Sequence, residues 1–158
     1  MKLITFALNE SRLNDSLSAI LEGQDLEGKC ADMIVENSKG QFLLLKRPDN
    51  DDLFPGKWCL PGGHRQDDET IRQGAERECF EECGIKVKDS IKLMNWTYPD
   101  GFKTTFFHSR QGIQFDDDTV TLSDEHVDYK WCSANEIKEM DLAGDLLDPL
   151  LKCIDSVQ

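Results

Sequence analysis

Long apolar runs, positive charge and histidine are all scarce in this chain of 158 residues, which has only 3 histidines. No apolar stretch approaches the roughly 20 residues that a membrane-spanning helix needs, so we expect no membrane span. The 18 lysines and arginines are outnumbered by 31 acidic residues, and the net charge is −13. Nucleic-acid polymers are bound by basic surfaces, so this charge argues against such a partner. It does not exclude a small nucleotide that arrives with a divalent cation.

The chain also lacks a recognisable export signal. Its opening residues, MKLITFAL, carry one lysine and a short apolar run without a small-residue cleavage site, which does not fit a signal peptide. We therefore expect a cytoplasmic protein whose six cysteines are reduced thiols. Cys79 and Cys83, with His64, are an alternative zinc site, but they lack the usual paired ligand spacing. The length and the 39% hydrophobic content favour one domain over residues 1–158.

Chemically informative residues concentrate between Gly63 and Ile85, in the run GHRQDDETIRQGAERECFEECGI. Thr70 and Gln73 have the T-x-x-Q spacing of a capping box. Gly84 stands where glycine commonly ends a helix. The run therefore predicts a helix over 71–83, preceded by a tight turn at Pro61-Gly62-Gly63 in which the glycines let the backbone approach a ligand.

This helix should have two distinct faces. Apolar side chains recur every four residues and should face a sheet, at Ile71, Ala75, Cys79 and Cys83. Glu78, Glu81 and Glu82 fall at i, i+3 and i+4, so their carboxylates are close and repel one another. A solvated acidic face is one interpretation. The other is a site for a divalent cation, and hard carboxylate oxygens suit Mg²⁺ or Mn²⁺.

The same run resembles the box that defines the Nudix hydrolase family, G-x5-E-x7-R-E-U-x-E-E-x-G-U, where U is aliphatic. Its fixed positions are all matched, by Gly63, Glu69, Arg77, Glu78, Glu81, Glu82 and Gly84. Only Cys79 departs, in an aliphatic slot where a thiol also packs as a small hydrophobe. The likeness extends over roughly residues 30–140, through LLLKR, GKWCLPGG and EHVDYKWCSANEI. It implies an α/β/α sandwich with a mixed central sheet.

The resemblance also implies roles for individual residues. Glu78, Glu81 and Glu82 would bind Mg²⁺, or Mn²⁺, together with the carbonyl of Gly62. Arg77 would orient these glutamates, and Glu69 would pair with Arg77. A further carboxylate, Glu125, matches a place where relatives carry a metal ligand or general base, so Glu78 and Glu125 are the two candidates for the base. His126 beside it could instead polarise water.

The implied activity is a metal-dependent pyrophosphohydrolase acting on a nucleoside diphosphate linked to another group. Candidate substrates are ADP-ribose or another nucleotide sugar, a dinucleoside polyphosphate, or a nucleoside triphosphate. Lys46, Arg47 and Arg65 are candidates for contacts with substrate phosphates. Two alternatives stay open: a Nudix-type nucleotide sensor without catalysis, and an enzyme like isopentenyl diphosphate isomerase, for which Cys59 would supply a catalytic thiol.

Outside the box, the pattern predicts strands over 30–35 and 42–46 joined by a hairpin turn at 37–40, and a strand over 57–60. Strands over 91–98 and 102–108 should pair through Pro99-Asp100-Gly101. A strand over 127–132 leads into a capping box at Ser133 and Glu136. Asp148 and Pro149 should begin a final helix. Aromatic side chains could stack on a base or fill the core, at Trp58, Trp96, Tyr98, Phe102, Phe106 and Phe107.

The first 29 residues do not match the family pattern. They suggest a strand over 1–8 and a helix capped by Asn9 or Ser11, with Leu13, Leu17, Ile20 and Leu21 on one face. This extension could dimerise the protein, cover the substrate or add a structural layer, and the last is our interpretation. Residues 30–140 would form the core, 116–118 a loop within it, and 141–158 would hold the C-terminal helix. A homodimer is compatible with the sequence but does not follow from it.

Overall fold

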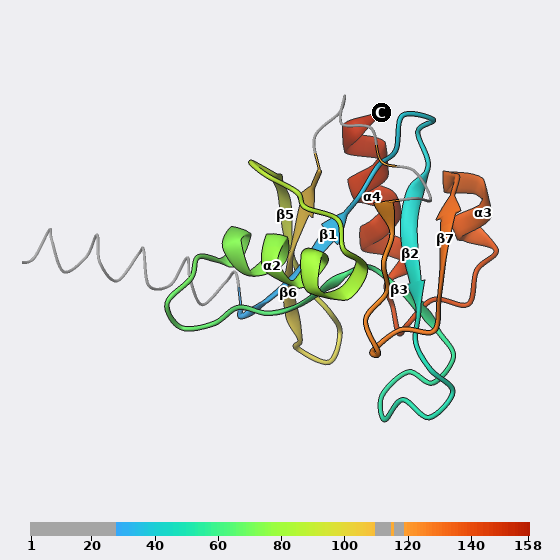
Figure 1. The fold of residues 1–158 in the computed structure, drawn as a ribbon, viewed down its shortest axis with the longest axis horizontal. Helices are drawn as coiled ribbons and strands as arrows, with labels where there is room; N and C mark the ends of the chain where they lie inside the picture. The colour runs from blue at the N-terminus through green and yellow to red at the C-terminus, as the bar shows by residue number, and fades with distance from the viewer. Residues whose placement is uncertain (1–27, 110–114, 116–118) are drawn as a thin grey trace, which may run out of the picture.

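The computed structural model describes residues 28–109, 115 and 119–158, which fold into strands layered between helices (Figure 1). The elements in chain order are β1 (Cys30–Ile34), β2 (Phe42–Lys46), β3 (Trp58–Cys59), β4 (Gly62–His64), α2 (Ile71–Cys83), β5 (Ile91–Thr97), β6 (Lys103–His108), β7 (Asp128–Cys132), α3 (Ala134–Lys138) and α4 (Leu147–Val157). The predicted strand and helix for residues 1–23 and the loop at 116–118 lie outside the described residues.

Two sheets form the middle layer. One has the order β4-β1-β6-β5 and is mixed, because β1 and β6 run parallel while β4 and β5 pair antiparallel with their neighbours. The other is antiparallel, with the order β3-β2-β7. They meet where Glu36 bridges Phe42 and the Leu43 N–H donates to the Val35 carbonyl over 3.0 Å. The predicted turn at 37–40 is present, but its two arms enter different sheets.

Side-chain alternation along β1 gives the molecule its two cores. Ala31, Met33 and Val35 face α2, whereas Ile34 belongs to the cluster that packs against α4. Asp32 alternates with the first set, so its side chain lies on the α4 side of the sheet. The two faces of one strand thus serve two separate interiors.

The helix α2 has the bounds that its sequence predicts. Thr70 and Gln73 form both bonds of the capping box, and Gly84 ends the helix in the left-handed region at φ 73°. Along the apolar stripe, Ala75, Cys79 and Cys83 are fully buried against the sheet and Ile71 packs at the edge of the same cluster. Local capping signals and a four-residue apolar repeat therefore determine this element.

The predicted turn at Pro61-Gly62-Gly63 is wrong. Residues 62–64 form β4, which pairs with β1, and neither glycine has a positive φ. Glycine is required here by close approach instead, as a Cβ on Gly62 would collide with the carbonyl oxygen of Ala31. A Cβ on Gly63 would lie 2.8 Å from Cδ of Glu78. Because glycine has no side chain, β4 can lie against both β1 and α2.

Asp148 is not the N-cap of the last helix, so this prediction is also wrong. The helix starts at Leu147, and the Leu150 N–H already donates to the carbonyl of Leu146 over 3.1 Å. Pro149 is accommodated because it sits in the first turn, where a backbone N–H has no partner within the helix. The β5–β6 hairpin and the capping box of Ser133 and Glu136 are confirmed.

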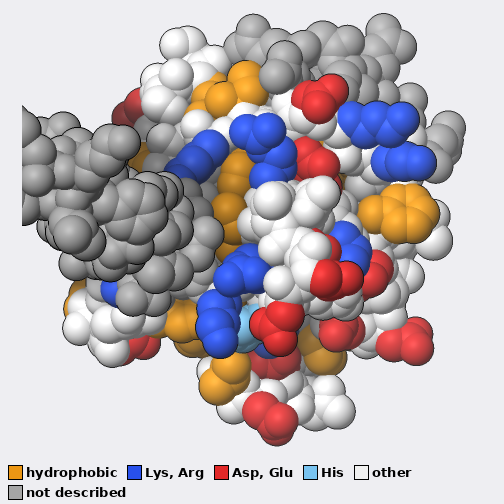
Figure 2. Space-filling view, turned by 90° about the vertical axis from the view of Figure 1, so that its left-hand side faces the viewer, with side chains coloured by type: hydrophobic (Ala, Val, Ile, Leu, Met, Phe, Trp, Pro, Cys, Tyr) orange, Lys and Arg blue, Asp and Glu red, His pale blue; other side chains and the backbone are white. Residues whose placement is uncertain are grey.

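The described surface carries both signs of charge. On the face shown in Figure 2, acidic and basic side chains lie side by side. All six cysteines are free and buried. None of the helices in the described ranges is long and apolar enough to cross a membrane.

Candidate active site

Arg77 is the centre of an ion-pair network at the exposed side of α2. Its Nε lies 3.1 Å from each carboxylate oxygen of Glu69, and Nη1 lies 3.0 Å from both Glu78 Oε1 and Glu81 Oε2. Nη2 donates to the carbonyl of His64 over 3.0 Å. The planar fork of donors thus joins the box glutamates to β4, which a single surface ion pair could not do.

Glu69 is held from two directions. Besides Arg77, the backbone N–H of Gln66 donates to its Oε1 over 2.7 Å. The hydrogen bonds from Arg77 are the main cause that lowers the pKa of Glu69. Glu69 therefore stays ionised and fixes the side chain of Arg77 against the loop that precedes the helix.

Glu82 lies deepest among the box carboxylates, with only 6% of its surface exposed. Its Oε2 accepts the backbone N–H of Gly62 over 3.2 Å. Burial raises the pKa of Glu82 to about 9. The hydrogen bond from Gly62 acts to lower this pKa, and the negative charges of Glu78 and Glu125 act to raise it. Burial also raises the pKa of Glu78, which the hydrogen bond from Arg77 opposes.

These carboxylates fit a divalent cation. Glu82 is buried and repelled by its acidic neighbours, and a hard cation among oxygen ligands would offset that cost. Within residues 28–109, 115 and 119–158, no group of three histidine, cysteine or acidic side chains is already gathered as a metal site. Arg77 instead holds Glu78 and Glu81. Their side chains would have to turn toward Glu82, while α2 keeps their backbones in place.

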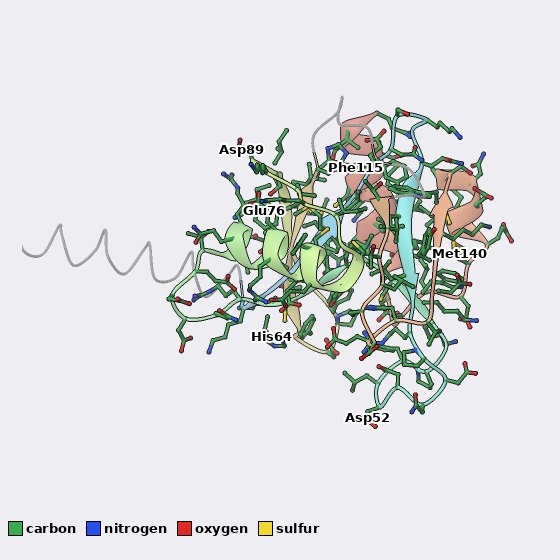
Figure 3. The ribbon with its side chains drawn as sticks, in the orientation of Figure 1. Asp52, His64, Glu76, Asp89, Phe115 and Met140 are labelled. Carbon is green, nitrogen blue, oxygen red and sulfur yellow. The ribbon has the colours of Figure 1, made fainter. Side chains whose placement is uncertain are left out.

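A cavity of about 730 Å³ has Glu82 in its lining. Its walls come from β1, β3 and β4, the β5–β6 hairpin, the loop after β2 and residues 143–146. Figure 3 places His64, which lines it, on the same edge of the molecule as the loop that carries Asp52. This volume is in the range of small-molecule sites.

The candidate phosphate contacts separate in space. Arg47 lines the cavity and pairs with Asp51 over 2.7 Å. Arg65 is not among the lining residues. Its Nη1 donates to the carbonyls of Gln66 and Glu69 over 3.3 and 3.2 Å, so it braces the loop before α2. Lys46 instead lies over the ring of Trp58, at 6.0 Å from its centroid.

Two polar residues after the box also reach this region. Glu125 is exposed, and its charge contributes to the raised pKa values of Glu78 and Glu82. His126 is buried and lines the cavity, with Nδ1 4.0 Å from Glu82 Oε2 and Nε2 3.5 Å from Cys59 Sγ. Burial lowers the pKa of His126 to about 4, so the imidazole is neutral.

The aromatic candidates divide between the cavity and the core. Tyr98 and Phe102 line the cavity, whereas Phe106 and Phe107 are fully buried. Sequence reasoning missed Leu53 and Phe54, apolar residues in an otherwise polar loop. It also missed Asp32, although a charge within the apolar strand CADMI was a usable signal.

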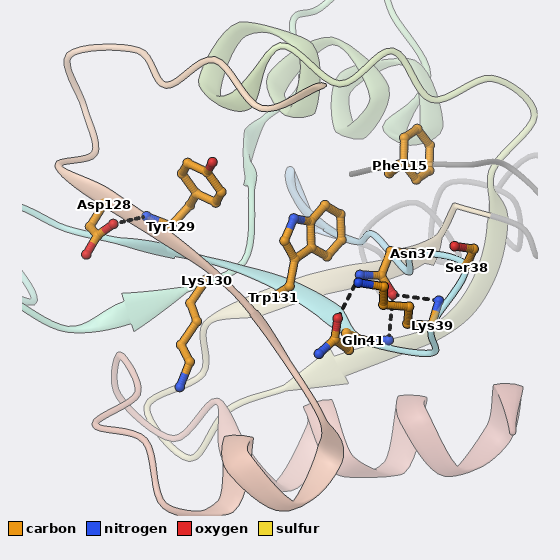
Figure 4. A pocket seen from close by; sticks show the side chains of 9 residues that line it. All are labelled: Asn37, Ser38, Lys39, Gln41, Phe115, Asp128, Tyr129, Lys130 and Trp131. Atoms are coloured by element: carbon orange, nitrogen blue, oxygen red, sulfur yellow. Dashed lines mark hydrogen bonds between the residues drawn. The ribbon is translucent and has the colours of Figure 1, made fainter. Parts of the chain in front are cut away.

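A second cavity of about 590 Å³ lies away from the box (Figure 4). It is lined by the turn after β1 and by β7, and contains none of the predicted site residues. Asn37 organises its rim, because Oδ1 accepts the backbone N–H groups of Lys39 and Gln41 over 3.0 and 2.9 Å. We assign no chemistry to it.

Strands lie between helices, Arg77 links Glu69, Glu78 and Glu81 on the exposed side of α2, and the neighbouring Glu82 lines a cavity. This arrangement fits the class of hydrolases that act on phosphoric anhydride bonds. A family model described as the NUDIX domain matches residues 27–151. Nucleoside triphosphatase NudI of Klebsiella pneumoniae (strain 342) is 32% identical over 123 residues, which cover 69% of this chain and 84% of that protein. The chain therefore belongs to the Nudix family and is a hydrolase of phosphoric anhydrides, as its sequence predicts.

Solved structures agree on the fold. The MutT protein from Methanosarcina mazei Go1 superposes with a TM-score of 0.63 at 30% identity, covering 81% of this chain and 92% of that one. The NUDIX domain of Shewanella oneidensis NrtR, complexed with ADP ribose, gives a TM-score of 0.67 at 20% identity, with 83% and 88% covered. The predicted α/β class with a mixed sheet is confirmed.

Proposed function

We propose that this protein is a Mg²⁺-dependent pyrophosphohydrolase that cleaves nucleoside triphosphates. The observation that carries the proposal is the position of Glu82, a buried carboxylate that binds the backbone N–H of Gly62 in β4 and lines a nucleotide-sized cavity. Among the substrate classes that the box alone admits, the nucleoside triphosphates are favoured by the NudI relatives, which are named for that activity.

Under this proposal Glu78, Glu81 and Glu82, with the carbonyl of Gly62, hold the metal. When bound, Mg²⁺ would neutralise phosphate charge and lower the pKa of a coordinated water. Arg77 sets the approach of Glu78 and Glu81, since one guanidinium nitrogen contacts both carboxylates. The cluster therefore places its carboxylates on one rigid helix, which is the positioning that phosphoryl transfer requires.

Glu125 is the general base that we favour. It is exposed, it lies outside the Arg77 network, and its charge acts on both Glu78 and Glu82. Glu78 is the less suitable base because its Oε1 already accepts a hydrogen bond from Arg77. A base takes a proton from the attacking water, so an amide at position 125 should lower kcat more than it raises KM.

A substrate screen tests the proposal. The protein is incubated with Mg²⁺ and nucleoside triphosphates, ADP-ribose, other nucleotide sugars or dinucleoside polyphosphates, and products are followed by nucleotide chromatography and phosphate release. Glu82→Gln is the inactive reference, and Glu139→Gln, an exposed glutamate after α3, is the matched control. Cleavage of triphosphates that Glu82→Gln abolishes and Glu139→Gln keeps is the expected result. Cleavage that persists in Glu82→Gln would contradict the site.

A further inference from the structure

Asp32 is a carboxylate that the proposed chemistry does not use. It lies in the middle of β1 and lines the same cavity as Glu82. Thr104 Oγ1 donates to its Oδ2 over 2.7 Å, and Thr104 itself is fully buried. The other oxygen, Oδ1, lies beside Gly62. A Cβ added to Gly62 would lie 2.7 Å from this oxygen. One oxygen of Asp32 is thus anchored and the other borders the space left by a glycine.

Asp32 and Glu82 lie on either side of Gly62. Asp32 pairs with Gly62 in the β1–β4 register, and the N–H of Gly62 donates to Glu82 Oε2 over 3.2 Å. Cross-strand partners are about 5 Å apart. A ligand whose phosphates lie against Glu82 can therefore reach Asp32 across Gly62.

Aromatic and apolar side chains line the same cavity as Asp32. Tyr98 and Phe102 of the β5–β6 hairpin line it, with ring centroids 6.0 Å apart. Leu53 and Phe54 line it from the loop after β2, although they are 74% and 37% exposed. Large apolar side chains that stay exposed at a cavity mark a binding surface, and flat aromatic rings favour a planar ligand.

The acidic side chains that line the cavity with Asp32 disfavour a further phosphate there. Asp100 and Asp145 line the cavity as well. Arg47 is the one lysine or arginine among the described lining residues, and it is already paired with Asp51. Carboxylate acceptors whose neighbouring cation is already paired suit a neutral ligand that carries hydrogen-bond donors.

We infer that Asp32 selects nucleobases with an exocyclic amino group, which donates to its Oδ1 while the ring lies among Phe54, Tyr98 and Phe102. This inference rests on the proposed function for the direction in which the nucleotide lies. Cytosine and adenine carry the amino group where uracil and hypoxanthine carry a carbonyl oxygen. A carbonyl facing a carboxylate forms no hydrogen bond and leaves a buried acceptor unpaired, which sites of this kind reject.

The test compares kcat/KM for dCTP against dUTP, and for dATP against dITP, with Mg²⁺. We expect the wild type to prefer the amino-bearing member of each pair by about 10-fold, the worth of one hydrogen bond to a charged group. Asp32→Asn keeps the shape but offers an amide donor, so the ratio should fall to about 1 or invert. Asp155→Asn, which removes the same charge at an exposed position of α4 that does not line the cavity, should keep the preference.

A second variant and a binding measurement keep the outcomes separable. Thr104→Val releases the anchored oxygen while Asp32 remains, and should reduce the preference without removing it. Dissociation constants of dCMP and dUMP for the wild type and Asp32→Asn need no hydrolysis. If the wild type binds dCMP more tightly than dUMP and Asp32→Asn abolishes the difference, the inference is supported. If no triphosphate is cleaved in that case, only the proposed function fails. Cleavage without preference, or a preference that Asp32→Asn leaves intact, overturns the inference alone.

Discussion

Two carboxylates border Gly62, and their surroundings differ in kind. Glu82 comes from α2, accepts one backbone N–H and is repelled by Glu78 and Glu125. Asp32 comes from β1, accepts a threonine hydroxyl and shares its cavity with aromatic side chains. Burial raises the pKa of both, to about 9 for Glu82 and about 6 for Asp32. We call the surroundings of these carboxylates the Glu82 end and the Asp32 end of the site. The Glu82 end suits a divalent cation, and the Asp32 end suits a neutral hydrogen-bond donor.

The largest effect should come from Glu82→Gln. We expect hydrolysis to fall by at least about 100-fold, since changing even the outer partners of a metal site costs 10–100-fold. Without metal, thermal stability should hold or rise at neutral pH. Burial raises the pKa of Glu82 in the folded protein. Its contribution to the free energy of unfolding is therefore complete below the pKa of the unfolded chain, and it is lost as the pH rises toward about 9. Melting curves at pH 5 and 8 measure this, and a variant that melts lower at pH 8 would contradict it.

Arg77→Lys should have the next largest effect. Lysine keeps the charge but loses the fork that joins Glu69, Glu78 and Glu81, so kcat/KM should fall by roughly 10–100-fold and Mg²⁺ should bind more weakly. The metal dependence of the rate and a direct Mn²⁺ titration report the two effects. Arg72→Lys, an exposed position on the same helix, is the control. Equal losses of kcat/KM in Arg77→Lys and Arg72→Lys would show that the helix, and not the guanidinium group of Arg77, causes the effect.

The two glycines of β4 should respond differently to alanine. A Cβ on Gly63 meets the carboxylate group of Glu78, the far end of a flexible side chain, so Gly63→Ala should fold and lose about 10-fold in activity as Glu78 is displaced. A Cβ on Gly62 meets backbone of β1, so Gly62→Ala should lower the melting temperature. Activity and melting curves for the pair separate these effects, and equal stability in both would refute the assignment.

Phe54→Ala should have the smallest effect. It removes apolar surface from the cavity and leaves Glu82 and the Arg77 network unchanged, so KM for a nucleoside triphosphate should rise by about 3- to 10-fold with kcat nearly unchanged. Phe80→Ala, at a phenyl ring that is 54% exposed on α2 and does not line the cavity, serves as the comparison. A fall in kcat alone would place Phe54 elsewhere in the reaction.

The Glu82 end could be predicted from the sequence because its residues are contiguous. Thr70, Gln73 and Gly84 fix the helix locally, and the spacing from Glu78 to Glu82 follows from its period. The pairing of Glu69 with Arg77 was also expected and is present. The metal, the general base and the roles of these residues stay predictions.

The Asp32 end could not be predicted in the same way, because its walls come from separate segments that only tertiary packing brings together. Gly62 and Gly63 read locally as a turn, yet pairing with β1, some 30 residues earlier, makes them a strand. The predicted phosphate contact of Arg65 stays a prediction, because Nη1 of Arg65 donates to the carbonyls of Gln66 and Glu69 and Arg65 does not line the cavity.

The most direct test of the account is a Mg²⁺ titration of dCTP hydrolysis by the wild type and Glu82→Gln, followed by release of inorganic phosphate or pyrophosphate. The account predicts that the wild-type rate is negligible without Mg²⁺ and saturates as Mg²⁺ is added, while Glu82→Gln stays at least about 100-fold slower throughout. A rate that is independent of Mg²⁺, or equal in the two proteins, would contradict the claim that Glu82 anchors a metal-dependent hydrolytic site.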